Sequence, residues 1–154
     1  MKNLLLYTTR HSSTEKCVRI LQAQLNGETT IINLQTHQAP ELSEFNTIIL
    51  GGSIYMGKTQ KELRKFAETR LQQLLEKPVL LFFCSRFRRE DDFHTNFPDM
   101  LVRHARRKSC FGGELSTANL GMFERLITKM VGGKDFSDLQ ETTIAEFAQA
   151  VNDI

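Results

Sequence analysis

Hydroxyl side chains cluster directly after the first apolar run of the chain, Leu4 to Tyr7, at Thr9, Ser12, Ser13 and Thr14. An amphipathic pattern follows, so this cluster forms a loop that leads into a helix. Such a loop presents unpaired backbone N–H groups and the positive end of the helix dipole, and the hydroxyl groups add further donors. This combination predicts an anion site, and a phosphate fits it best. The alternative is structural, because Ser or Thr before a helix is often only its N-cap.

A glycine-rich segment, Gly51 to Gly57, follows the third apolar run. Its glycines allow the backbone to approach a planar ligand closely. The apolar side chains between them, Ile54, Tyr55 and Met56, are costly to expose unless a flat ring system covers them. The segment therefore predicts an aromatic ligand. The alternative is a tight turn whose apolar residues pack on the core.

A third segment, Cys84 to Phe93, combines aromatic side chains with the arginines Arg86, Arg88 and Arg89. Guanidinium and aromatic groups suit the edge of a ligand or an acidic partner. Because Glu90 and two aspartates follow the arginines, the alternative is a solvated loop of mixed charge.

The elements that must position these segments alternate along the chain. Runs rich in apolar residues predict five strands, at Leu4–Tyr7, Thr30–Leu34, Thr47–Gly51, Val79–Cys84 and Cys110–Leu115. Apolar residues at helical spacing predict one helix around Cys17 to Leu25 and a second around Leu63 to Leu75. Strands that are apolar on both faces and alternate with helices predict an α/β fold, a doubly wound parallel sheet with helices on both faces. Ligands of such sheets bind at the carboxyl ends of the strands, where the three segments lie.

Other stretches complete the predicted organisation. Pro40 predicts one short helical turn within the linker Gln35–Phe45. The stretch Leu101–Lys108 predicts a basic helical end that complements the helix dipole, with attraction to an anionic membrane surface as the alternative. Two final helices are predicted over Asn119–Val131 and about Ser137–Asn152.

Composition argues against several classes of protein. The 154 residues are 40% hydrophobic and 25% charged, as expected for a single globular domain over residues 1–154. A net charge of +2 is too small to indicate nucleic acid binding. Cys17, Cys84 and Cys110 lack metal-ligand spacing, which predicts no metal site and reduced thiols in a cytoplasmic protein. No apolar run approaches the roughly 18 residues of a transmembrane segment. GxGxxG, Walker, GxSxG and HExxH motifs are absent, which leaves a mononucleotide as the predicted ligand.

Together, these segments resemble the flavodoxin family. The resemblance spans essentially the whole chain, through the T-x-x-x-x-T pattern of Thr9–Thr14 and GGSIYMG after the third strand. Four blocks, YTTRHSSTEK, TIILGGSIYMGK, FERLITKMVGG and IAEFAQAV, make it most similar to the branch with the menaquinone-dependent protoporphyrinogen oxidases of haem synthesis. The resemblance implies a flavodoxin-like five-stranded sheet of order 2-1-3-4-5 and non-covalently bound FMN.

The resemblance also implies a role for each site residue. The phosphate would be held by Thr9, His11, Ser12, Ser13 and Thr14. The isoalloxazine would lie between Ser53, Ile54, Tyr55 and Gly57 on one side and Ser85, Arg86 and Phe87 on the other. The flavin carries the chemistry, so no side chain is predicted to be catalytic.

The function implied by the resemblance is an FMN-dependent oxidoreductase. It would pass reducing equivalents between a small-molecule substrate, specifically protoporphyrinogen IX, and a quinone acceptor. We expect it in the cytoplasm, with peripheral contact at the inner face of the membrane as an alternative. Two other functions stay open. One is a one-electron carrier that docks to a redox partner protein, and the other is a protein of the same fold that binds no flavin and acts through its surface.

Overall fold

The computed structural model describes residues 1–10, 13–87, 89–115, 136–137 and 140–154. Its strands are β1 (Lys2–Tyr7), β2 (Glu28–Asn33), β3 (Thr47–Ser53), β4 (Val79–Cys84), β5 (Arg107–Cys110), β6 (Glu114–Leu115) and β7 (Phe136–Ser137). Its helices are α1 (Ser13–Gln22), α2 (Lys61–Thr69), α3 (Leu71–Leu75), α4 (Asp91–Asn96), α5 (Asp99–His104) and α7 (Glu141–Asn152), with a 3-10 turn, η1, at Leu42–Glu44.

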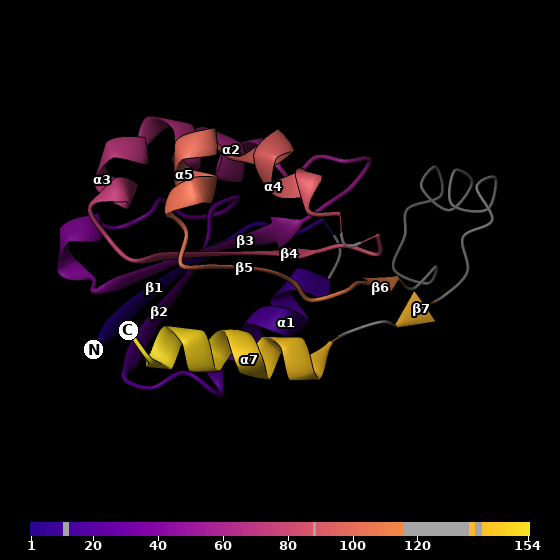
Figure 1. Cartoon of the computed structure of the whole chain (residues 1–154), viewed down its shortest axis with the longest axis horizontal. Helices are drawn as coiled ribbons and strands as arrows, with labels where there is room; N and C mark the ends of the chain where they lie inside the picture. The colour runs from indigo at the N-terminus through magenta and orange to yellow at the C-terminus, as the bar shows by residue number, and fades with distance from the viewer. Residues whose placement is uncertain (11–12, 88, 116–135, 138–139) are drawn as a thin grey trace.

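A parallel sheet of five strands forms the centre of the molecule (Figure 1). The strand order is β2-β1-β3-β4-β5, which confirms the predicted fold class and the order 2-1-3-4-5. After β1 the chain continues into α1 on one face of the sheet, and after β3 it continues to α2 on the other (Figure 1). Connections that diverge in this way leave a crevice at the carboxyl edge of the sheet.

Alternate strand residues point to opposite faces of the sheet and build two separate cores. Leu4, Ile48 and Leu81 belong to the core beneath α2 to α5. Leu5 and Ile49, their neighbours along the chain, belong to the core that α1 and α7 cover. Because both faces are covered, the central strands are apolar throughout rather than alternating.

Consecutive phenylalanines of β4 anchor aromatic contacts on each face. Phe82 stacks on Phe111 with the ring centroids 4.7 Å apart and meets Phe147 of α7 edge-on at 6.0 Å. Phe83 packs against Phe93 of α4 at 4.9 Å and stacks on Phe97 at 5.2 Å. Aromatic pairs of this kind contribute about 0.5–1.5 kcal/mol each beyond burial of area. These contacts hold α4 beside the loop that leaves the carboxyl end of β4.

The fifth strand lies earlier in the chain than predicted. It spans Arg107–Cys110 rather than Cys110–Leu115, and Gly112 beyond it adopts a φ of 78° that is incompatible with a continued strand. β5 is an edge strand, where polar residues are tolerated, so a search for apolar runs misses it. The basic stretch predicted as one helical end is therefore divided, because α5 ends at His104 and Lys108 belongs to β5.

Other boundaries also differ from the prediction. The second helix is broken at Arg70 (φ −106°, ψ 14°) into α2 and α3, and both pieces bury apolar side chains in one core. α4 lies where the sequence predicts only a loop. The last helix begins at Glu141, and Ser137 belongs to β7. The short helical turn expected after Pro40 is present as η1. The helix predicted over 119–131 lies outside the described residues.

Candidate functional site

The three segments predicted to bind a ligand meet at the carboxyl edge of the sheet. The strand registers place Tyr7 of β1 beside Gly51 of β3, and Ser53 of β3 beside Cys84 of β4. Ile54, the first residue after β3, donates its N–H to the carbonyl oxygen of Cys84 at 3.0 Å. We call the connections that leave these strands the first loop (residues 8–12), the second loop (54–60) and the third loop (85–90).

Backbone amides tie the first loop to neighbouring strands. The Thr8 N–H donates to the Gly51 carbonyl oxygen at 3.1 Å, and the Arg10 N–H donates to Ser53 Oγ at 3.1 Å. The Thr9 N–H donates to Gln35 Oε1, beyond β2, at 2.8 Å. These amides are engaged within the protein, so an anion here would rely mainly on the start of α1.

The sequence also predicts a phosphate contact for His11, Ser12 and Ser13. His11 and Ser12 lie outside the described residues, and Ser13 is described only as the first residue of α1.

Thr14 places a buried hydroxyl in the first turn of α1. Its side chain is fully buried, and its Oγ1 has no hydrogen-bond partner among the described residues. The nearby Cys84 thiol is a weak hydrogen-bonding group and does not meet the geometry of a bond to it. An unsatisfied buried hydroxyl costs about 1–3 kcal/mol, a cost that a bound ligand would relieve by accepting its hydrogen bond. At the N-terminus of a helix of 10 residues, an unpartnered donor fits a phosphate.

Gln60 joins the first and second loops, a role that the sequence prediction missed. Thr8 Oγ1 donates to Gln60 Oε1 at 2.9 Å, and Gln60 Nε2 donates to Ser53 Oγ at 3.0 Å. The same serine oxygen accepts the Arg10 N–H, so it links both loops. Thr59 Oγ1 also donates to Gln60 Oε1, at 3.3 Å. The one signal for Gln60 in the sequence is its position directly before a helix.

The second loop is a tight turn with exposed side chains. Tyr55 and Lys58 exchange backbone hydrogen bonds of 2.9 and 3.1 Å. Between them, Met56 and Gly57 have φ values of 50° and 80°, a conformation that favours glycine and strains methionine. Met56 is 85% exposed, and the Arg10 guanidinium lies 3.7 Å from the centroid of the half-buried Tyr55 ring. A strained turn that exposes a large apolar side chain indicates a binding surface.

Asn96 of α4 forms hydrogen bonds with the backbone of the second loop. Its Oδ1 accepts the Thr59 N–H at 2.8 Å, and its Nδ2 donates to the carbonyl oxygens of Gly57 at 3.1 Å and Asp92 at 2.8 Å. Asn96 is only 4% exposed, so these bonds satisfy a buried amide. Nothing in the sequence pattern pairs this residue with the second loop.

The third loop starts buried and becomes exposed. Ser85 is buried; its Oγ accepts the Phe87 N–H at 3.3 Å, and its carbonyl oxygen accepts the Cys110 thiol at 3.5 Å. Phe87 is 68% exposed, and the guanidinium carbons of Arg86 and Arg89 lie 5.8 and 5.2 Å from its ring centroid. The loop therefore presents an aromatic ring flanked by cations.

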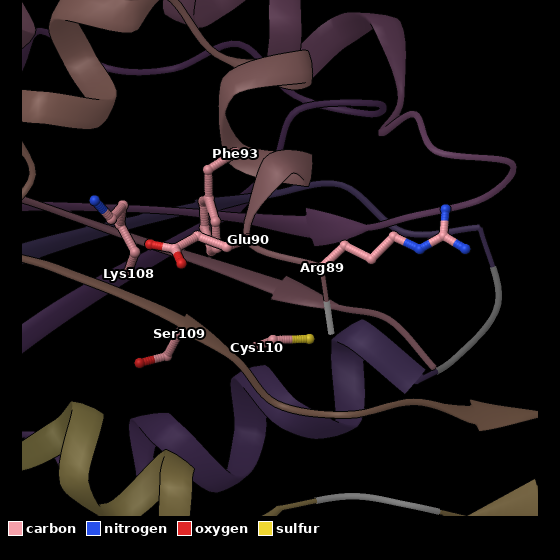
Figure 2. Close-up of a pocket in the computed structure, with 6 residues that line it drawn as sticks. All are labelled: Arg89, Glu90, Phe93, Lys108, Ser109 and Cys110. Atoms are coloured by element: carbon pink, nitrogen blue, oxygen red, sulfur yellow. The ribbon is translucent and has the colours of Figure 1, made fainter. Parts of the chain in front are cut away.

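A cavity of about 220 Å³ lies next to the third loop, between the start of α4 and β5 (Figure 2). Its lining residues are Arg89, Glu90, Phe93, Lys108, Ser109 and Cys110. In Figure 2 the Arg89 side chain extends away from Lys108, toward the carboxyl edge of the sheet. None of the residues predicted to bind a cofactor lines this cavity.

The cysteines lie beneath the site rather than on it. Cys17 and Cys84 are buried, and Cys110 is half-buried, all as free thiols. Contact with the Cys17 thiol, together with burial, raises the pKa of Cys84 well above its usual range, so Cys84 stays protonated at neutral pH. In the part of the chain that the structure describes, His, Cys, Asp and Glu form no cluster that could hold a metal ion. The described helices are also too short or too polar to cross a membrane.

The structure brings most of the predicted site residues to one edge. These residues are Thr9, Thr14, Ser53, Ile54, Tyr55, Gly57, Ser85, Arg86 and Phe87. Thr14, Ser53 and Ser85 are buried there, whereas Arg86 and Phe87 are on the exposed rim. Their roles in binding stay predictions.

Comparison with known proteins supports one family. The family model of the flavodoxin domain matches residues 4–138. The structure is similar to oxidised flavodoxin 2 from Bacillus cereus, with a TM-score of 0.66, 20% identity and 99% of each chain covered. It is also similar to Fusobacterium nucleatum flavodoxin bound to flavin mononucleotide, with a TM-score of 0.57, 13% identity and 99% of this chain and 97% of that chain covered.

A larger enzyme contains a similar fold. Rubredoxin oxygen:oxidoreductase from the anaerobe Desulfovibrio gigas matches with a TM-score of 0.59 and 13% identity over 97% of this chain. The match spans only 36% of that enzyme. A search of curated protein sequences found no match. The strand order, the loops at the carboxyl edge and the match over residues 4–138 lead to one conclusion: the chain belongs to the flavodoxin domain family.

Proposed function

We propose that this chain binds FMN at the carboxyl edge of its sheet, as one domain over residues 1–154, and uses it to transfer electrons. One observation carries the proposal. A helix start with a buried hydroxyl at Thr14, which has no partner in the part of the chain that the structure describes, converges with two loops that present Tyr55 and Phe87. The first feature fits a phosphate and the other two fit a flat ring, and FMN contains both. The flavodoxin from Fusobacterium nucleatum, which has the same fold, is bound to flavin mononucleotide.

At the phosphate end, we expect the N-terminus of α1 to supply most of the recognition. Thr14 Oγ1 and the first-turn N–H groups would donate hydrogen bonds, and the helix dipole favours the negative charge. The remaining hydroxyls and the imidazole predicted to help are those of Thr9, Ser12, Ser13 and His11.

At the ring end, the second and third loops would orient the isoalloxazine. Ser53, Ile54, Tyr55 and Gly57 would line one side, and Ser85, Arg86 and Phe87 the other. The hydrogen bonds of Gln60 and Asn96 hold the second loop in place for this task. When bound, FMN supplies the redox chemistry because its ring accepts and releases electrons.

The proposal is tested by the visible absorption spectrum of the protein after incubation with FMN and removal of excess ligand. We expect the bands of oxidised flavin at about one equivalent per chain. Riboflavin, which has the same ring without the phosphate, is the matched control and should be retained much more weakly, because it cannot use the α1 site. A protein that stays colourless with FMN would refute the proposal and favour a surface-acting protein of the same fold.

A narrower prediction concerns the substrate. Its support is the resemblance of four sequence blocks to the protoporphyrinogen oxidase branch, and it specifies oxidation of protoporphyrinogen IX with a quinone acceptor. FMN-loaded protein, protoporphyrinogen IX and a soluble menaquinone analogue should yield fluorescent protoporphyrin. If no porphyrin forms while artificial acceptors are still reduced, the substrate prediction is wrong.

The second candidate is an electron carrier that acts with a partner protein. The exposed Met56 and Phe87 on the two ring-binding loops favour it, because a large apolar side chain at a loop tip suits contact with another surface. A carrier would leave porphyrinogen unoxidised but would exchange electrons with other redox proteins.

A further inference from the structure

A chain of hydrogen bonds runs in one direction from the first and second loops to the end of β3. It begins at the buried hydroxyls of Thr8 and Thr59, which both donate to Gln60 Oε1, at 2.9 and 3.3 Å. The Gln60 amide continues the chain, because its Nε2 donates to Ser53 Oγ at 3.0 Å. The same serine oxygen accepts the Arg10 N–H at 3.1 Å.

The two threonine hydroxyls fix which way the Gln60 amide faces. Each hydroxyl has one hydrogen to donate. Within the described ranges, Thr8 and Thr59 have no acceptor for that hydrogen other than Gln60 Oε1. An amide turned the other way would place its NH2 group against both hydroxyls, and two buried hydrogens would lose their acceptor. Gln60 therefore faces Ser53 as a donor.

Ser53 is left with a single way to form a further hydrogen bond. A serine oxygen has two lone pairs and one hydrogen. Gln60 and the Arg10 N–H occupy both lone pairs, so the hydroxyl can only donate. In the part of the chain that the structure describes, no group accepts this hydrogen. Ser53 is 7% exposed and ends β3 at the carboxyl edge, where a ligand can supply the missing acceptor.

We propose that the Ser53 hydroxyl donates a hydrogen bond to an acceptor atom of the flavin ring, and that Gln60 is the positioning residue that fixes this direction. The inference rests on the proposed function. Ser53 directly precedes Ile54, whose N–H is bonded to the Cys84 carbonyl oxygen, so Ser53 lies where the two ring-binding loops leave the sheet. The ring offers carbonyl oxygens and unprotonated nitrogens, and hydrogen bonds to such atoms tune its electron chemistry.

A fixed donor also makes the site selective. A flat ring that presents an acceptor to Ser53 satisfies the buried hydroxyl, whereas an apolar ring of the same shape leaves it unpaired. The site therefore favours a heteroaromatic ring with acceptor atoms at its edge.

The first experiment measures binding of FMN and riboflavin to Ser53→Ala by quenching of flavin fluorescence. Riboflavin has the same ring without the phosphate, so loss of a hydrogen bond to the ring should raise both Kd values by the same factor, roughly threefold to tenfold. Redox titration of the FMN-bound protein should show a shifted midpoint potential, because the ring loses a donor. A hydroxyl that only supports the fold would leave the potential unchanged.

The second experiment tests Gln60 with a substitution of almost the same shape. A carboxylate only accepts hydrogen bonds, so Gln60→Glu should turn the Ser53 hydrogen away from the ligand. The Kd for riboflavin, which is uncharged, should rise about as much as in Ser53→Ala. Combining the two substitutions should add little, because both remove the same donor.

Gln72→Glu is the matched control. Gln72 is exposed on α3, which precedes β4 and lies away from the loops at the carboxyl edge (Figure 1). This substitution adds the same charge and should leave the Kd for riboflavin unchanged. Thermal melts of every variant separate a loss of folding from a loss of binding.

Three results would overturn the inference while the parent protein still binds FMN. An unchanged Kd and midpoint potential in Ser53→Ala would show that this hydroxyl forms no bond to the ring. A rise in Kd for FMN but not for riboflavin would place the bond on the phosphate. Additive effects of Ser53→Ala and Gln60→Glu would show that Gln60 does not act through Ser53. A parent protein that binds no flavin would instead refute the proposed function.

Discussion

Replacing Thr14 by valine should strengthen the fold and weaken FMN binding. Thr14 Oγ1 is buried without a hydrogen-bond partner among the described residues, and valine has the same shape without the hydroxyl. Leaving a hydroxyl unpaired costs about 1–3 kcal/mol, and valine and threonine have similar helix propensities. We therefore expect the FMN-free Thr14→Val protein to gain about 1 kcal/mol in the free energy of unfolding, a rise of roughly 2–4 °C in Tm.

The same substitution should act in the opposite direction on the cofactor. If Thr14 Oγ1 donates to the phosphate, its loss removes a hydrogen bond to a charged group, worth about 1.5–3 kcal/mol. The Kd for FMN should then rise roughly tenfold to 150-fold. Urea unfolding of the FMN-free protein measures the first effect, and titration by quenching of FMN fluorescence measures the second.

Thr47 provides the matched control. It is also fully buried, and its Oγ1 has no partner within the described ranges, but it lies at the amino end of β3, at the opposite edge of the sheet from the loops. Thr47→Val should stabilise the protein and leave the Kd for FMN unchanged. An unchanged Kd in Thr14→Val would remove Thr14 from the phosphate site. A less stable Thr14→Val protein would show that its hydroxyl has a partner in the fold.

Three further predictions test the support of the site. Asn96→Leu loses three hydrogen bonds, two of them buried and one part-buried, and should lower the free energy of unfolding by about 2–4 kcal/mol in urea titrations; a loss below about 1 kcal/mol would contradict these bonds. Gly57→Ala meets no atom within 4 Å and should cost about 1–2 kcal/mol for its positive φ alone. Gly51→Ala places a Cβ 1.9 Å from the Phe82 ring and should cost clearly more in thermal melts, so equal losses would refute the packing argument. Burial raises the pKa of Asp92 above its unperturbed 3.8, so its ionisation in the folded state costs stability as pH rises past that value. Asp92→Asn should therefore be more stable than the parent at pH 7 and lose this advantage in acid, and the reverse trend would contradict the effect of burial.

The amino-acid pattern alone determined the centre of the fold. The run Val79–Cys84 was predicted and observed with the same bounds, because a strand covered by helices on both faces must be apolar at every position. The same argument located β1 and β3, and with them the loops that meet at the carboxyl edge. The loops after these strands lie together because the carboxyl ends of parallel strands share one edge of the sheet.

Features with a polar or broken pattern were decided only by the tertiary structure. β5 carries Arg107 and Lys108 because it is an edge strand, and a local pattern does not show which strand will lie at an edge. Gln60 and Asn96 acquire their roles through partners on other elements, so no spacing in the sequence identifies them. The local sequence thus determined which segments are buried, because burial depends on the hydrophobicity of each residue. The tertiary structure decided which polar groups meet, because hydrogen bonding depends on atoms that distant segments bring together.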